Sequence, residues 1–398
     1  GAVVLGYLAA REALPDRPGV AYGAAALLAF NPQFVFLGAS ASGTALAALL
    51  GAAALYLALR VANGRQRTGP GAAALLGLLV GLGMLADATL LVGLALPPLA
   101  YGANLWRLRR AVAARGDVPR VDAARALLLP ATFGVAVALA VGGWWYVQNL
   151  AAGLALAGGG ALREAPLGAW EAVQAVARSL RSYWGLFGWM NIPADEAYYV
   201  FVALVTILGV AGLGLAAMWT LWYRRGASGQ PWHSVGLVAV WVLLHAGAYA
   251  WQARTAACPQ GRLLFSGGAG VAILLGLGCY VLVPRRYGGV LVGALAAVLL
   301  VVAAAAPYRY IAPAYAAPVR VALEEAPATM SDLAIRYSED VFLLGYHLED
   351  PNLEAGDTLR VRLYWLATGA MDEDLTVSLR VYGRDDAVIG ALDSYPGM

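Results

Sequence analysis

Long apolar stretches, separated by short polar segments, follow one another along most of this chain. A helix needs about 20 apolar residues to cross the hydrocarbon core of a bilayer. Hydrophobic residues make up 61% of the 398 residues and charged residues only 13%, which leaves too few polar side chains to cover a water-soluble core. The sequence therefore predicts an all-α polytopic membrane bundle, with the lipid bilayer as its first partner.

The predicted membrane helices differ in length. Several are shorter than the roughly 17 residues of the shortest full crossings, so they fit half-crossings, tilted helices or segments shielded by neighbours. The number of crossings therefore stays open. The predicted segments are Gly19–Phe30, Gly43–Leu59, Gly71–Leu85, Ala88–Ala100, Ala123–Trp145, Tyr198–Trp222, Val235–Trp251, Leu263–Val283 and Gly288–Ala306.

Arginine predicts the orientation, because the sequence contains no lysine and cytoplasmic loops carry an excess of basic residues. Four arginine clusters lie between the predicted spans, and an even number of spans separates each from the next. The clusters span residues 60–67, 107–125, 224–225 and 285–286. The segments predicted to lie on the outer side of the cell membrane are 31–42, 86–89, 148–197, 252–261 and everything after Pro307.

The chain changes character after Pro307. Fifteen of its 24 acidic residues lie between Glu324 and Asp393. In Leu359–Trp365 and Leu375–Val381 apolar and polar residues alternate, which is typical of strands with one buried face. Turn-forming residues separate these runs, so we expect a small extracytoplasmic domain resembling a β-sandwich.

Three regions follow from these patterns. We predict a transmembrane domain over 1–306 with an outer loop over 148–197, a linker over 307–329, and a β-rich domain over 330–398. The chain opens inside an apolar run without Met and stops within the β-rich region. We therefore expect a fragment, with a truncated sandwich.

Polar residues at membrane depth or at its outer rim are the candidate functional residues, because such positions are costly for polar groups. Asp87 is either a functional carboxylate or part of a solvated turn. Arg262, with Gln260 close by, begins a span from outside. It either snorkels to the interface or binds a phosphate, since its planar fork and a helix N-terminus both suit that anion. His245 is interpreted as a packing residue that is hydrogen-bonded across helices.

Aromatic and glycine patterns leave further alternatives open. Trp184 and Trp189 lie in the predicted outer loop and form either an interfacial belt or an aromatic wall for a sugar. Gly77 and Gly81 match the spacing of a helix-packing motif, but a chance match is expected in a chain with 48 glycines.

Several kinds of chemistry lack their signatures. Cys258 and Cys279 are predicted to lie too far apart along the membrane normal for a disulfide. The three histidines are scattered, so we expect no metal site. The Walker, Rossmann and serine-hydrolase signatures are absent as well, and we expect neither a cofactor nor a nucleic-acid partner.

Four short segments together resemble a known family. They are Asn31–Phe36, Trp184–Asn191, Gln260–Arg262 and Gly356–Leu359. Their order, on segments that are all predicted to be outside, is similar to that in bacterial members of the GT-C superfamily. These are polytopic membrane glycosyltransferases such as protein mannosyltransferases and the lipid A aminoarabinose transferase.

The resemblance implies a GT-C-like fold and an inverting sugar transfer. The donor would be a sugar linked to polyprenyl phosphate, and the acceptor a glycan, lipid or protein on the outer side. The catalytic acid of the family would lie upstream of Gly1, so the fragment alone is expected to be inactive. The substrate-binding residues that the resemblance favours are Asn31, Thr44, Asp87, Trp189, Asn191, Gln260 and Arg262.

Two positions depart from the family pattern. Relatives tend to carry an Asp where this chain has Ser42-Gly43-Thr44, and a Lys is common where it has Asp87 before Ala88-Thr89. An acid at Asp87 would oppose phosphate binding. Either the donor is held differently or activity has been lost.

Two other classes of function remain open. A transporter or flippase would also use helix breaks such as those at Asn31-Pro32 and Leu96-Pro97-Pro98. A noncatalytic membrane scaffold would use its outer domain to bind glycan. The predicted outer loop and β-rich domain favour surface chemistry over transport.

Overall fold

The structure is a computed structural model of the chain. It describes residues 1–40, 42–66, 69–113, 115, 122, 124–156, 169–188, 190–223, 232–255, 260–316, 320–322, 330–350, 352, 359–369, 376–383 and 388–394. The chain divides into two compact units, Gly1–Ile311 and Ala312–Met398.

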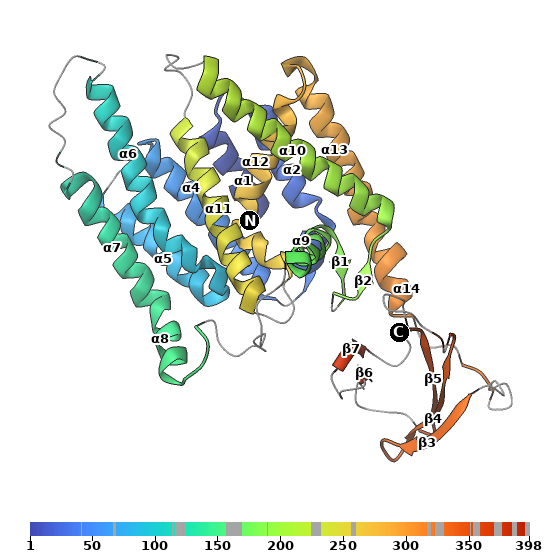
Figure 1. The fold of residues 1–398 in the computed structure, drawn as a ribbon. Helices are drawn as coiled ribbons and strands as arrows, with labels where there is room; N and C mark the ends of the chain where they lie inside the picture. The colour runs from blue at the N-terminus through green and yellow to red at the C-terminus, as the bar shows by residue number, and fades with distance from the viewer. Residues whose placement is uncertain are drawn as a thin grey trace. The chain divides into compact units, whose positions relative to one another are not determined.

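The first unit is a bundle of helices with one small hairpin (Figure 1). Its elements up to the hairpin are α1 (Ala2–Ala13), α2 (Pro18–Ala29), α3 (Pro32–Ala39), α4 (Gly43–Ala62), α5 (Pro70–Ala86), η1 (Ala88–Ala95), α6 (Leu96–Ala113), η2 (Ala124–Leu128), α7 (Leu129–Ala138), η3 (Leu139–Gly143), α8 (Trp144–Ala151), α9 (Ala169–Trp184), β1 (Leu186–Phe187) and β2 (Ile192–Pro193). The remaining elements are α10 (Glu196–Tyr223), α11 (Trp232–Thr255), η4 (Gly261–Gly267), α12 (Gly268–Val281), α13 (Arg285–Ala306) and η5 (Pro307–Ile311).

Seven helical segments of the described chain are long and apolar enough to cross a membrane. They are Gly43–Ala62, Ala88–Ala113, Arg125–Ala151, Glu196–Trp219, His233–Ala253, Gly261–Val281 and Arg286–Ala314. An eighth is added if α2 and α3, which meet at a bend of 55°, count as one broken span. The predicted polytopic helical architecture is therefore confirmed at this level, and α5, with 17 residues, is a shorter apolar helix.

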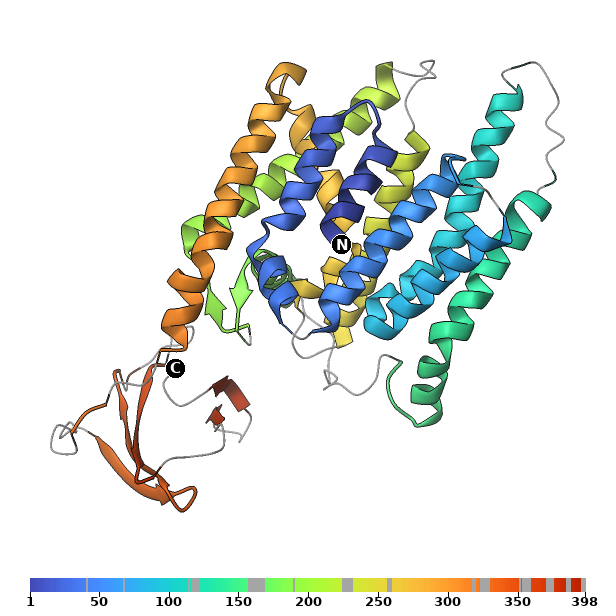
Figure 2. The same ribbon diagram turned by 180° about the vertical axis from the view of Figure 1, so that it is seen from behind.

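The helices that precede the arginine clusters all finish at one end of the helical unit. In Figures 1 and 2 the C-terminal ends of α4, α6, α10 and α12 point the same way. We call this the arginine end. The opposite end, where η4 and the starts of α4 and η1 lie, is called the η4 end. The even spacing of spans between arginine clusters therefore has a direct counterpart in the fold.

Glycines set how closely α5 packs against its neighbours. A Cβ at Gly77 would lie 2.2 Å from the carbonyl oxygen of Gly134 in α7, and one at Gly142 would lie 2.4 Å from that of Gly81. Only glycine allows backbones to approach so closely. The Gly77–Gly81 spacing was expected to be a chance match, and that expectation is wrong.

The predicted outer loop 148–197 contains ordered elements. The helix α8 ends at Ala151, and α9 and the antiparallel hairpin β1–β2 follow before α10. The burial of Trp184 (2% exposed) and Phe187 (0%) anchors this segment to the helical unit. The segment therefore belongs to the core of the η4 end.

The second unit contains two antiparallel sheets. One has the order β3 (Ser331–Arg336), β4 (Val341–Leu348) and β5 (Val361–Ala367), and the other pairs β6 (Val377–Tyr382) with β7 (Val388–Ser394). The alternating runs at 359–365 and 375–381 thus coincide with β5 and β6. The helix α13 ends at Ala306, the predicted end of the last span, and η5 and then α14 (Ala312–Ala314) follow it.

Candidate functional site

The break between α2 and α3 is organised by Asn31. Pro32 occupies the first turn of α3, where the missing N–H of proline costs nothing. The Asn31 side chain caps α3 by accepting from Phe34 N at 3.1 Å, and its amide donates to the carbonyl oxygen of Tyr183 at 3.1 Å. Asn31 is 1% exposed. Its side chain therefore joins α3 to the end of α9.

Gln33 lies two residues further along and is fully buried. Its Oε1 accepts from Leu186 N at 2.7 Å, which ties α3 to the hairpin. Its Nε2 has no hydrogen-bond partner among the described residues. A buried polar group without a partner costs about 1–3 kcal/mol, so Gln33 is a group held ready for an acceptor. Sequence reasoning quoted this residue only as part of a motif.

The segment η4 begins directly after Gln260 and packs against the end of α9. Gly261 N donates to Ser182 Oγ at 2.7 Å. A Cβ at Gly261 would lie 2.0 Å from the carbonyl oxygen of Ser179, so only glycine fits. Arg262 follows in η4 and is half-buried, and no ion pair or hydrogen bond engages its side chain within the described residues.

An aromatic stack holds these segments together. Tyr183 stacks on Phe265 of η4 with ring centroids 4.6 Å apart, and Phe34 of α3 contacts Phe265 at 5.2 Å. Burial raises the pKa of the Tyr183 phenol, which therefore stays neutral. Trp184 lies in the same core, so the predicted choice between an interfacial belt and an exposed sugar wall does not apply to it.

Asp87 reaches η4 through a chain of hydroxyl groups. Its Oδ1 accepts from Thr89 N at 2.8 Å and from Thr89 Oγ1 at 2.7 Å, which caps η1. The Thr89 hydroxyl in turn lies 2.8 Å from the Ser266 hydroxyl. Thr44 is buried in the first turn of α4, where its neighbour Gly43 packs on the carbonyl oxygen of Ala86.

The hairpin turn carries the remaining predicted residues. Asn191 is half-buried, and its backbone N donates to the carbonyl oxygen of Phe187 at 3.3 Å. Gly188 adopts φ of +60°, and a Cβ there would lie 2.7 Å from Asn191 Oδ1. Trp189 lies outside the described residues. The hairpin reaches the other predicted residues through Leu186 and Gln33.

The fold thus brings together most of the predicted site. Asn31, Asp87 and the pair Gln260 and Arg262 come from three distant parts of the sequence, and all lie in η4 or in elements that pack against it. Thr44 lies on α4, which packs against η4. Thr89, Tyr183 and Ser266 complete the arrangement and were missed, because their only sequence signal is proximity to the quoted motifs.

His245 differs from its predicted role. It is 1% exposed, and its Nδ1 lies 3.0 Å from the carbonyl oxygen of Trp241 on the same helix. The expected hydrogen bond across helices is therefore absent from the described residues. The Nε2 has no partner there, and Gly267 of η4 packs directly on the ring.

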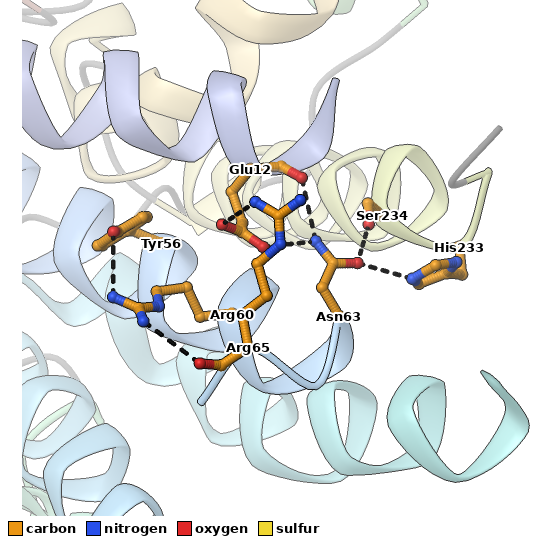
Figure 3. Close-up of polar contacts among 7 residues, drawn as sticks. All are labelled: Glu12, Tyr56, Arg60, Asn63, Arg65, His233 and Ser234. Atoms are coloured by element: carbon orange, nitrogen blue, oxygen red, sulfur yellow. Dashed lines mark hydrogen bonds and ion pairs between the residues drawn. The ribbon is translucent and has the colours of Figure 1, made fainter. Parts of the chain in front are cut away.

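A second polar cluster lies at the arginine end (Figure 3). Glu12 is 7% exposed and accepts from Asn63 Nδ2 at 2.8 Å, and its Oε2 lies 3.3 Å from Arg65 Nη1. Asn63 Oδ1 accepts from His233 Nε2 and Ser234 Oγ, both at 2.7 Å. Sequence reasoning missed Glu12, although an acid at the end of an apolar run is a signal.

Metal and thiol chemistry find no support in the described part of the chain. No group of three potential metal-ligating side chains occurs there. Cys279 is a buried free thiol near the carbonyl oxygen of Val205. Cys258 lies outside the described residues.

Comparison with known proteins gives no relative: no family model, no curated protein and no solved structure matches the chain. The class must therefore come from the fold itself. In the part of the chain that the structure describes, seven apolar helices are long enough to cross a bilayer, which indicates a multi-pass membrane protein, and the C-terminal unit contains two small sheets.

Proposed function

We propose that this protein is a membrane glycosyltransferase of the GT-C type. It transfers a sugar from a polyprenyl-phosphate donor to a glycan, lipid or protein acceptor at the η4 end. In this proposal the η4 end faces the outside of the plasma membrane, and the β-rich unit is extracytoplasmic.

One observation carries the proposal. Three of the four segments that resemble the family meet at the end of α9. Asn31 Nδ2 donates to Tyr183 O, Gln33 Oε1 accepts from Leu186 N, and Gly261 N donates to Ser182 Oγ. The Gln33 bond joins two segments directly, and the other two bonds reach the residues just before Trp184. These bonds join residues that are 152, 153 and 79 positions apart. Segments that resemble one functional motif set thus form a single structural group.

Arg262 is the proposed ligand of the donor phosphate. It stands in the first turn of the span Gly261–Val281, where the helix dipole also favours an anion. Its guanidinium has no acid partner among the described residues, so its charge is available. Gln260 precedes it and is half-buried.

The remaining residues have supporting roles. Asn31 already uses both ends of its side-chain amide for protein contacts, so we assign it positioning of α3 against α9. The free Nε2 of Gln33 suits a sugar hydroxyl or phosphate oxygen. Asp87 is neutralised by no cation among the described residues, but its contacts with Thr89 direct the carboxylate toward η1.

The chemistry is a displacement at the anomeric carbon. The acceptor oxygen bonds to that carbon, the bond from carbon to phosphate oxygen breaks, and polyprenyl phosphate leaves with the electron pair. A carboxylate base removes the proton of the acceptor hydroxyl. Cationic stabilisation of the leaving phosphate is worth roughly 10²–10³ in rate for a single well-placed donor.

The test uses protein from the complete reading frame, reconstituted in vesicles with radiolabelled polyprenyl-phosphate hexoses and pentoses. We expect product formation, and a loss of at least roughly 100-fold in Arg262→Ala. The matched control is Arg109→Ala, because Arg109 is an exposed arginine of α6 at the arginine end. Equal turnover in Arg262→Ala and Arg109→Ala would remove Arg262 from the site.

A flippase is the second candidate, and the broken pair α2–α3 favours it. Discontinuous helices with polar residues at the break are typical of transporter binding sites, and Asn31 and Gln33 lie at this break. Movement of the labelled donor across the vesicle membrane without product would support this candidate. A glycan-binding scaffold would show neither flux nor turnover.

A further inference from the structure

Three arginines surround the turn that follows α4. Arg60 stands in the last turn of α4, and its Nη2 donates to the carbonyl oxygen of Arg65 at 3.3 Å. Arg107 comes from α6 and lies against Gly64, where a Cβ would be 2.0 Å from its Nη2. Gly64 has φ of +67°, a backbone conformation that favours glycine. Arginine side chains from two helices and one turn therefore border the same turn.

Glu12, the acid beside this turn, neutralises only one of the three arginines. Glu12 pairs with Arg65, with 3.3 Å between Oε2 and Nη1, and it is almost completely buried. Arg107 donates to the neutral Asn104 Oδ1 at 3.0 Å, and Arg60 to the hydroxyl of Tyr56 at 3.4 Å. Within the described residues no carboxylate pairs with Arg60 or Arg107, so two positive charges remain.

The two guanidinium groups also retain unused donors. A guanidinium has five N–H groups, and the bonds described above use only a few of them. Among the described residues the Nε atoms of Arg60 and Arg107 are buried without a partner, so packing and not a counter-charge holds these stems there. Both residues are half-buried, which leaves their outer faces open to a ligand.

The cluster in Figure 3 fixes the end of α4, where Arg60 stands, and the turn after it. Asn63 bonds to Glu12 on one side, and on the other it accepts from His233 and Ser234 of α11. The turn is thereby tied to α1 and α11 before any ligand arrives. Binding to a preorganised group of donors costs less conformational entropy than binding to mobile side chains.

We propose that Arg60 and Arg107 bind the phosphodiester of an anionic lipid headgroup, in the leaflet that meets the arginine end. The arginine fork matches the geometry of phosphate oxygens, and basic pockets between membrane helices are typical sites for such headgroups. The site is far from η4 along the helices and does not depend on the proposed transferase activity.

Arg109 and Arg110 provide the contrast. They lie on the same helix as Arg107, at the same end, but both are exposed, and Arg110 stacks over Trp106 with 4.4 Å from its Cζ to the ring. A general attraction between arginines and an anionic surface would involve them as much as Arg60 and Arg107. A specific site formed by Arg60 and Arg107 would not involve Arg109 and Arg110.

The experiment measures the association of spin-labelled phosphatidylglycerol with the whole protein in phosphatidylcholine vesicles, using spin-labelled phosphatidylcholine as the reference lipid. We expect R60Q and R107Q each to lower the preference for phosphatidylglycerol by about fivefold, and the double variant by about 30-fold. The control pair R109Q and R110Q should change it by less than about twofold. The helix content and melting temperature in pure phosphatidylcholine show whether each variant folds.

If R60Q/R107Q does not fold, the double variant R60K/R107K is measured in its place. Lysine keeps the positive charge but lacks the planar fork of the guanidinium, so a reduced preference for phosphatidylglycerol in this variant supports the site. An equal loss in the control pair would overturn the proposal in favour of general charge attraction. A second measurement adds millimolar inorganic phosphate as a competitor of the labelled lipid. Failure of phosphate to displace the labelled lipid supports a headgroup site, whereas complete displacement would show that the ligand is free phosphate.

Discussion

The Glu12 cluster at the arginine end and the buried Gln33 and His245 side chains at the η4 end differ in how their polar groups are satisfied. At the arginine end, Glu12 and Asn63 satisfy each other and fix the junction of three helices. At the η4 end, Gln33 Nε2 and His245 Nε2 are buried without partners among the described residues. Polar groups that satisfy one another rigidify a structure, whereas unsatisfied ones indicate a place where a ligand or water is accommodated.

The largest effect is expected for Glu12→Ala. It removes the carboxylate that accepts from Asn63 Nδ2 and pairs with Arg65, and we expect a loss of about 3 kcal/mol in the free energy of unfolding. Denaturation in detergent micelles measures it. The matched control is Glu196→Ala, which breaks an exposed pair with Arg181 and should cost less than about 1 kcal/mol. Equal losses would contradict the special role of the arginine end.

Gly261→Ala tests the packing of η4 against α9. The new Cβ would collide with the backbone of Ser179, so we expect a loss of about 2 kcal/mol and faster proteolysis of α9. Gly247→Ala is the control, because no atom lies within 4 Å of its Cβ position on α11. That change should be neutral or slightly stabilising. If Gly261→Ala is also neutral, the contact between η4 and α9 is not close.

Variants of Asn31 and Gln33 compare an amide whose hydrogen bonds are satisfied with one whose Nε2 is not. Asn31→Ala loses a helix cap and the bond to Tyr183, at a cost of about 1.5 kcal/mol. Gln33→Met loses the bond from Leu186 but also removes the unpaired Nε2, so the unfolding free energy should change by less than about 0.5 kcal/mol. A larger loss for Gln33→Met would mean that its amide is fully satisfied.

The smallest expected effect is the pH dependence of the contact that Asp195 makes at the η4 end. Hydrogen bonds from the Tyr310 hydroxyl and then from Arg309 lower the pKa of Asp195. A lowered pKa means that the contact is fully formed above the ordinary carboxyl value of about 3.9 and is lost as the pH falls through the lowered value. The protection of η5 amides from hydrogen exchange, measured relative to the intrinsic rate at each pH, should therefore fall in acid. In Asp195→Asn this protection should no longer depend on pH in this range.

Much of the fold could be predicted from the sequence. The predicted span at Leu263–Val283 overlaps Gly261–Val281, the alternating runs became β5 and β6, and the even spacing of arginine clusters matches the common end of α4, α6, α10 and α12. These features depend on local composition and on the length of a bilayer crossing. Breaks were harder to predict, because η5 follows α13 directly where the sequence predicted a linker.

The site was only partly predictable. Asn31, Asp87 and Arg262 were chosen as polar residues near helix ends. Asn31 bonds to the end of α9, which packs on η4, and Asp87 reaches η4 through Thr89 and Ser266. Their partners Tyr183, Ser182 and Ser266 carry no sequence signal of their own. Glu12 and Asn63 lie 51 residues apart, and nothing in either local sequence indicates that they meet.

By itself, then, the sequence determined a chain of apolar helices with arginine-rich turns and a β-rich C-terminal region, because hydropathy and alternation are properties of neighbouring residues. The tertiary structure alone decided which polar groups are paired and which are left open. It also decided that Gly77 and Gly261 are sites of close backbone contact. Those outcomes depend on helices far apart in the sequence approaching within hydrogen-bond distance, and no local pattern encodes that distance.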